Sequence, residues 1–140
     1  MIEFLTGTLI QSTPTYAVVQ TGGIGWHLPI TLSAYDGLPA EGQPVTLPTF
    51  LAVKEDSLTL YGFADVQERS LFELLLQVNG IGPKLAMTVL SGLPPSEFIR
   101  AVSSKDLKSL NRIPGIGKKM AERLMLELKD KVGSPGTDSP

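Results

Sequence analysis

A twelve-residue segment occurs twice in this chain, with a fixed offset of 35 residues. The first copy reads NGIGPKLAMTVL at 79–90, and the second reads PGIGKKMAERLM at 114–125. Apolar residues upstream of each copy keep the same offset, so the sequence predicts a repeated unit of helix, glycine turn and helix. The two copies share the same residue at five positions: Gly80 and Gly115, Ile81 and Ile116, Gly82 and Gly117, Lys84 and Lys119, and Ala86 and Ala121.

The start of the second helix in each unit is suited to an anion. Its first backbone amides have no partner within the helix, and the helix dipole is positive there. Glycine lets a phosphate oxygen approach these amides, and lysine adds a positive charge. Stability alone would favour acidic residues at the positions of Lys84, Lys118 and Lys119, because a cation near a helix start opposes the dipole by a few tenths of a kcal/mol. The repeat therefore favours phosphate binding at two points.

A purely structural interpretation remains open, in which the glycines cap helices and allow close packing. Under either interpretation we expect Ile81 and Ile116 to face the core. A nucleotide-binding GxxxxGK[ST] loop does not fit, because Arg112 replaces its first glycine and Lys119 its hydroxyl residue. We therefore expect no ATP hydrolysis by this chain. Contact between backbone and phosphate carries no base identity, so binding should follow DNA structure rather than DNA sequence.

The chain divides into two parts and a tail. Short runs of β-branched and aromatic residues at 15–21, 25–30 and 44–53 predict a small antiparallel barrel over 1–64, with a hairpin or bulge at GGIG, 22–25. Helical spacing follows and predicts an all-α region over 65–132. The ending at 133–140 is rich in glycine, serine and proline and reads as a flexible linker or tail.

Charge differs sharply between the two parts. The net charge is −2, but residues 1–65 hold one basic residue against six acidic ones, whereas residues 66–140 hold eleven against eight. Such asymmetry indicates different roles for the two halves, with nucleic acid suited to the second. The chain has no cysteine, a single histidine, His27, and no apolar run near the ~20 residues that span a bilayer. We expect a cytoplasmic protein without catalytic residues, metal site or cofactor.

The two turns match the helix-hairpin-helix motif. Together with GGIGW and LAVKEDSLTLYGF they make the chain resemble the RuvA family, whose members bind Holliday junctions in branch migration. The resemblance implies an oligonucleotide-binding (OB-fold) barrel followed by an all-α domain with two helix-hairpin-helix motifs. It also implies a non-catalytic homotetramer, or an octamer, that holds four-way junction DNA open during recombination and repair. The RuvB motor and the RuvC resolvase are the implied protein partners.

Site residues follow from the resemblance by position. Glu55 and Asp56, which alone would read as an ordinary hairpin tip, correspond to the acidic pin that keeps the junction open and square. Lys54 stands where the family usually has arginine, which weakens any bidentate phosphate contact there. The implied DNA-binding residues are Gly80, Gly82, Lys84, Gly115, Gly117, Lys118, Lys119 and Arg123.

The family continues beyond a linker into a third domain that docks on the motor, and this sequence ends at Pro140. We therefore expect junction binding without coupling to the motor. Two alternatives remain. A helix-hairpin-helix glycosylase or nuclease would need catalytic groups, and only Glu122, Glu127 and Asp130 follow the second turn. Single-strand binding by the barrel is disfavoured by its negative charge, and its aromatic residues, such as Trp26 and Tyr61, are expected in the core.

Overall fold

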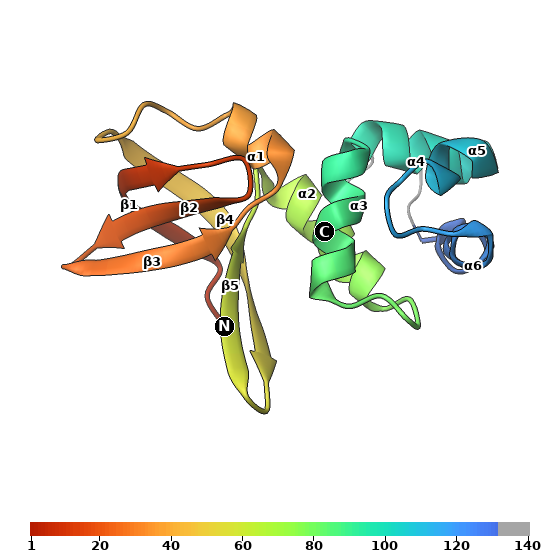
Figure 1. Ribbon diagram of the computed structural model, residues 1–140, viewed down its shortest axis with the longest axis horizontal. Coiled ribbons are helices and arrows are strands. Elements are labelled where there is room, and N and C mark those ends of the chain that lie inside the picture. The colour runs from red at the N-terminus through yellow and green to blue at the C-terminus, as the bar shows by residue number, and fades with distance from the viewer. Residues whose placement is uncertain (132–140) are drawn as a thin grey trace. The chain divides into compact units, whose positions relative to one another are not determined.

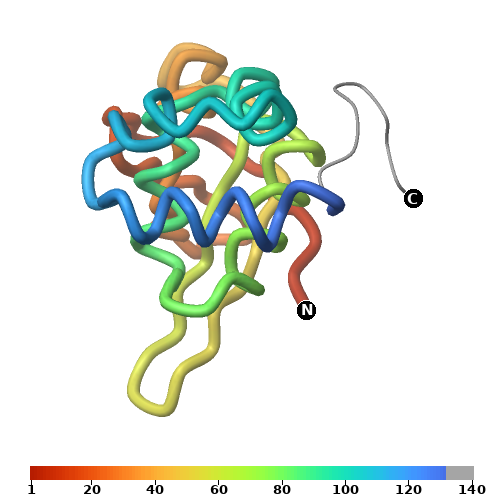
Figure 2. The backbone as a smooth tube through the Cα atoms, turned by 90° about the vertical axis from the view of Figure 1, so that its right-hand side faces the viewer, coloured from red at the N-terminus to blue at the C-terminus, as the bar shows by residue number. Residues whose placement is uncertain are grey.

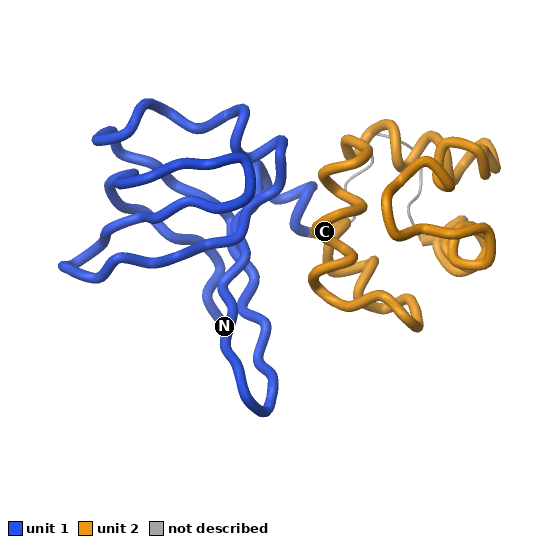
Figure 3. The backbone as a smooth tube through the Cα atoms, in the orientation of Figure 1, with its two compact units in different colours: residues 1–69 blue, residues 70–140 orange. Residues whose placement is uncertain are grey.

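The computed structural model describes residues 1–131 and divides the chain into two compact units. The first unit is Met1–Arg69, and the second begins at Ser70 (Figure 3). The tail expected at 133–140 lies outside the described residues.

The first unit is a nearly closed barrel. Its strands are all antiparallel and lie in the order β3-β2-β1-β4-β5, and a bridge between Ile30 and Gly62 joins the two ends of this order. A one-turn helix, α1 (Leu32–Asp36), connects β3 to β4. This arrangement confirms the expected OB-type barrel. The strands are β1 (Phe4–Ser12), β2 (Tyr16–Thr21), β3 (Ile24–Pro29), β4 (Pro44–Lys54) and β5 (Ser57–Gly62).

Alternating residues of these strands fill the barrel core. Leu9, Val19 and Leu28 are fully buried, because successive strand residues point to opposite faces of the sheet. Tyr61 is buried and Trp26 packs partly buried against the core, as the sequence predicted for both aromatics.

The β4–β5 hairpin extends beyond the other strands as a two-stranded ribbon (Figures 1 and 2). Strand β1 pairs with β4 only over 44–48, whereas the β4–β5 ladder continues from Thr49 to Lys54. Among the described residues no third strand pairs with the outer part of the ribbon, and residues 53–58 are all exposed. Glu55 and Asp56 form its tip.

The helical part of the chain follows the barrel. Its core contains Phe72, Phe98, Leu110 and Leu124, all fully buried. The expected all-α region with two helix-turn-helix units is confirmed, and its last helix ends at Leu128. Within the described residues no helix is long and apolar enough to cross a membrane. The helices are α2 (Val66–Leu76), α3 (Pro83–Gly92), α4 (Pro95–Ser103), α5 (Leu107–Asn111) and α6 (Lys118–Leu128).

Candidate nucleic-acid interface

The two glycine turns have the same backbone conformation. The first glycine of each has a positive φ, +93° at Gly80 and +84° at Gly115. The isoleucine that follows is buried, and its N–H donates to the carbonyl three residues earlier, at 3.1 Å for Ile81 and 3.0 Å for Ile116. The sequence prediction that both isoleucines face the core is confirmed. A positive φ favours glycine strongly, so the first glycine of each turn is required by the fold.

The second glycine of each turn begins the next helix. Gly82 precedes α3 and Gly117 precedes α6, both with extended backbone, and neither helix has a side-chain hydrogen bond at its start. Helix α4 likewise starts without a side-chain cap, whereas α5 is capped: Asp106 accepts from the N–H of Ser109 at its start. The first amides of α3 and α6 therefore lack the side-chain oxygen that usually satisfies them.

Both helix starts are open to solvent and positively charged. A Cβ atom built on Gly82 or Gly117 would meet no atom within 4 Å. The side chains of Lys84, Lys118 and Lys119 are exposed, and in the described part of the chain none of them has an acidic side chain within ion-pair distance. Amide donors, open space and unpaired ammonium groups are the features that an anion-binding helix start requires.

The two turns pack against each other in a reciprocal way. A Cβ on Gly80 would lie 3.1 Å from the Cε atom of Met120, and a Cβ on Gly115 would lie 3.1 Å from the Cδ1 atom of Leu85. Leu85 and Met120 occupy the same position of the repeat, 35 residues apart. Each glycine turn therefore packs against the first turn of the helix in the other repeat. This contact fixes the two helix starts suited to anions relative to each other.

Arg123 connects helix α6 to the first of the two glycine turns. Its Nη1 atom donates to the backbone carbonyl of Asn79 at 3.0 Å, and its Nε atom lies 4.0 Å from Glu127. The side chain remains about half exposed, at 48%. A guanidinium has five donors, so these contacts leave others for a further acceptor.

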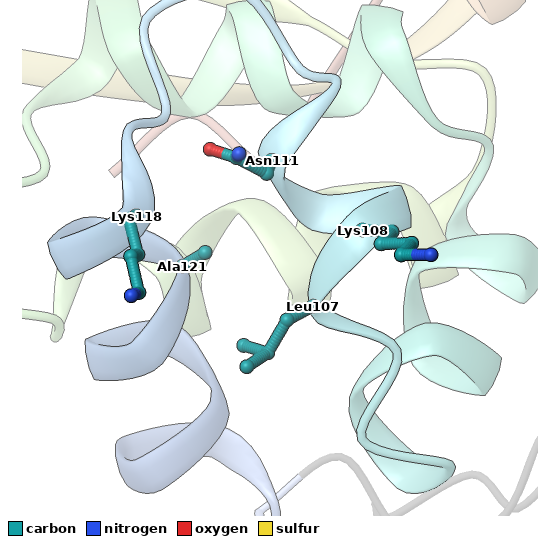
Figure 4. Close-up of a pocket in the computed structure, with 5 residues that line it drawn as sticks. All are labelled: Leu107, Lys108, Asn111, Lys118 and Ala121. Atoms are coloured by element: carbon teal, nitrogen blue, oxygen red, sulfur yellow. The ribbon is translucent and has the colours of Figure 1, made fainter.

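A small hollow lies between α5 and α6, lined by Leu107, Lys108, Asn111, Lys118 and Ala121 (Figure 4). Lys108 and Lys118 stand on opposite sides of it. Its volume of about 190 Å³ is below the ~300–1,000 Å³ typical of pockets for small molecules. In residues 1–131 no group of three histidine, aspartate or glutamate side chains is placed to hold a metal ion.

The acidic tip of the β4–β5 hairpin is a separate charged feature. Lys54 pairs with Ser57 across the hairpin, which leaves Glu55 and Asp56 as the two connecting residues. All four residues are exposed. The described structure thus keeps the two turns and the acidic tip on different compact units.

The residues that join the two turns were missed at the sequence level. No known sequence motif assigns a contact to Leu85, Met120 or the carbonyl of Asn79. The repeat frame was the available signal, because it pairs Leu85 with Met120 at equivalent positions. Nothing in the sequence indicated that Arg123 would reach Asn79, 44 residues away.

Family models match both parts of the chain. Residues 1–62 match the model described as the RuvA N terminal domain, and residues 72–130 match the model described as a SAM-like helix-hairpin-helix tandem. The matched ranges contain the acidic tip and both glycine turns.

Several curated relatives are similar along nearly the whole chain, each named "Holliday junction branch migration complex subunit RuvA". The relative from Marinobacter nauticus is 48% identical over 95% of this chain and 64% of its own length. The relative from Marinomonas is 50% identical over 95% and 66%, and the one from Laribacter hongkongensis is 48% identical over 99% and 69%. This chain therefore spans about two thirds of the length of these relatives.

Proposed function

Because this chain belongs to the RuvA family, we propose that it binds four-way DNA junctions by their structure and holds them open for branch migration. The observation that carries this proposal is the pair of uncapped, lysine-bearing helix starts at Gly82 and Gly117, which the reciprocal packing of their turns holds together. The family match favours this function over that of a helix-hairpin-helix glycosylase or nuclease.

Each glycine turn would hold one stretch of DNA backbone. A phosphate oxygen would accept from the first free amides of α3 or α6, and Lys84 or Lys119 would add a charge-assisted hydrogen bond. Lys118 and Arg123 would contribute further positive charge beside the second turn. Such contacts address the sugar-phosphate backbone and not the base edges, so they support binding without sequence preference.

The glycines of each turn would have different tasks. Gly80 and Gly115 would set the shape of the turn, because glycine adopts the positive φ found there without the strain that a Cβ atom causes. Gly82 and Gly117 would leave room for the phosphate, because no atom lies within 4 Å of the place that a side chain would occupy.

The acidic tip would lie where the DNA strands exchange. Glu55 and Asp56 would repel nearby phosphates and so keep the arms of the junction apart. Repulsion opposes binding, so the positive helix starts must provide the net affinity. Four copies of the tip around one junction imply a homotetramer, or an octamer if two tetramers enclose it. The RuvB motor would then drive branch migration on the opened junction, and the RuvC resolvase would be a further partner.

Binding of this chain to a four-way junction, compared with linear duplex of the same arm sequence, tests the proposal by fluorescence anisotropy. We expect the junction to bind at least tenfold more tightly, with a logarithmic salt slope of about −0.9 for each phosphate contacted. Equal affinities for junction and duplex would contradict the proposal.

A matched pair of variants assigns the binding to the helix starts. Lys119→Gln removes a charge in the first turn of α6, and Lys129→Gln removes one just past the end of the same helix, about 15 Å away along its axis. We expect Lys119→Gln to weaken junction binding about five- to tenfold, as for one lost charge-assisted contact, and Lys129→Gln to change it less than twofold. Equal effects would mean that net charge alone, and not the helix start, determines affinity.

A further inference from the structure

The exposed end of the β4–β5 ribbon carries a pair of large apolar side chains directly behind the acidic tip. Val53 and Leu58 are 68% and 71% exposed and stand opposite each other across the hairpin. Opposed residues of an antiparallel pair lie on the same face, so the two side chains form one apolar surface. We call Val53 and Leu58 the apolar collar.

The apolar collar continues a face that begins in the barrel core. Leu51 and Leu60 are the next opposed pair on the same face, two residues closer to the barrel. Leu60 is buried in the core and Leu51 packs against it. Beyond this pair the ribbon has no neighbouring strand, so the collar receives no cover from the part of the barrel that the structure describes. A contiguous exposed apolar surface is typical of an interaction site.

We propose that the apolar collar contacts the faces of DNA bases at the strand-exchange point, where they lack a stacking neighbour. This inference rests on the proposed function, because it places the ribbon at the centre of a four-way junction. A base pair at that point exposes one apolar face, and apolar side chains inserted at base steps are a known way for proteins to take the place of a stacking neighbour. The acidic tip and the collar would act together: Glu55 and Asp56 repel phosphates, and Val53 and Leu58 receive the uncharged bases.

A second copy of the same ribbon is the other possible occupant, and charge disfavours it. Each tip carries two carboxylates beside one ammonium group, that of Lys54, so contact between two collars would bring together ribbon ends of like net charge. Bases carry no such charge. We therefore assign the collar to DNA and treat packing between copies as an outcome of the test.

The test uses a four-way junction with 2-aminopurine beside the strand-exchange point and a second junction with the probe in the middle of an arm. Val53→Thr with Leu58→Thr removes the apolar surface but keeps residues that favour strands. Val53→Ile with Leu58→Met keeps the apolar surface. Ile24→Thr is the matched control, because Ile24 is an exposed apolar residue at the start of β3, 55% accessible.

Binding of the unaltered chain should change the emission of the exchange-point probe. We expect the double threonine variant to lose at least half of that change and to bind the junction about three- to tenfold more weakly, as for two lost apolar contacts. The isoleucine and methionine variant and Ile24→Thr should behave as the unaltered chain, and the arm probe should respond equally to all four proteins. Thermal unfolding and solution mass, measured in parallel, establish that the fold and the assembly are retained.

Three results would overturn the inference. An exchange-point signal that the double threonine variant leaves unchanged would mean that the bases do not meet the collar. Loss of assembly in that variant would assign the collar to packing between copies. Failure of the unaltered chain to prefer junction over duplex would refute the proposed function itself, and this outcome is distinguishable because it needs no variant.

Discussion

Glu68 is a buried carboxylate near the start of α2, and its protonation is coupled to the stability of the fold. Its Oε1 atom accepts from the hydroxyl of Thr31 at 2.6 Å and from the N–H of Ala64 at 2.8 Å, while Oε2 has no hydrogen-bond donor among the described residues. Burial raises the pKa of Glu68, the two hydrogen bonds oppose this shift, and the neighbouring charge of Asp65 adds to it. The folded protein therefore binds the Glu68 proton more tightly than the unfolded chain does.

The sign of the pH effect follows from this raised pKa. The contribution of Glu68 to stability is complete below its ordinary pKa of 4.5 and is lost as pH rises through the higher pKa of the folded state. Glu68→Gln cannot ionise and should remove this decline. Urea unfolding between pH 4 and 8 should therefore show the free energy of unfolding of the unaltered chain falling relative to that of the variant. Parallel curves for the two proteins would contradict the prediction.

Lys105 is the one residue other than glycine with a positive φ in the described part of the chain, at +58°. It follows α4, where the N–H of Asp106 donates to the carbonyl of Ala101 and the N–H of Lys105 to that of Val102. This is the hydrogen-bond pattern of a helix end that usually carries glycine. We expect Lys105→Gly to raise the free energy of unfolding by about 0.5–1 kcal/mol. Lys108→Gly, inside α5, should lower it by about 1 kcal/mol, and a loss of stability in both would contradict the argument.

At the level of elements, the two glycines of each turn should respond differently to alanine. Gly80→Ala should destabilise the protein by about 1–2 kcal/mol through its positive φ, and the new Cβ would also press on Met120. Gly82→Ala should cost less than about 1 kcal/mol, because its backbone is extended and its surroundings are open. Its added methyl group would nevertheless stand where the phosphate oxygen is proposed to approach.

Thermal unfolding and junction binding, measured on the same two variants, separate the roles. Gly82→Ala should lower the melting temperature by no more than a few degrees and weaken binding about tenfold, the effect of losing one or two hydrogen bonds to a charged group. Gly80→Ala, in contrast, should mainly lower the melting temperature. A Gly82→Ala variant that binds the junction normally would show that the phosphate does not approach this glycine.

The sequence predicted the elements that follow local rules. The repeat revealed both turns and the helices after them, and strand periodicity revealed β2, β3 and β4 within a few residues. It did not identify α1, a five-residue helix whose start depends on Thr31, because so short a helix has almost no periodicity. Contacts such as Thr31 with Glu68 and Arg123 with Asn79 join residues 37 and 44 positions apart. Only the folded chain brings those groups together, so no local pattern could indicate them.

For the whole molecule, the difference in net charge between the two compact units should determine how the protein interacts with DNA. Residues 1–69 hold two basic and seven acidic residues, and residues 70–131 hold ten basic and six acidic. A polyanion should therefore be attracted by the second unit and repelled by the first. The acidic tip is an exposed part of that repulsion, since residues 53–58 are all exposed and pair with no third strand among the described residues.

Neutralising the tip should consequently strengthen binding. At low salt we expect Glu55→Gln with Asp56→Asn to bind a four-way junction as tightly as the unaltered chain or up to about tenfold more tightly. This difference in affinity should shrink above 0.1 M salt, because the screening length falls below ~10 Å. Asp36→Asn with Glu73→Gln removes the same charge elsewhere and should change affinity less. Anisotropy titrations across salt concentrations measure both. A clear loss of affinity in the tip variant would mean that the carboxylates contact the DNA directly, because a purely repulsive charge cannot weaken binding when it is removed.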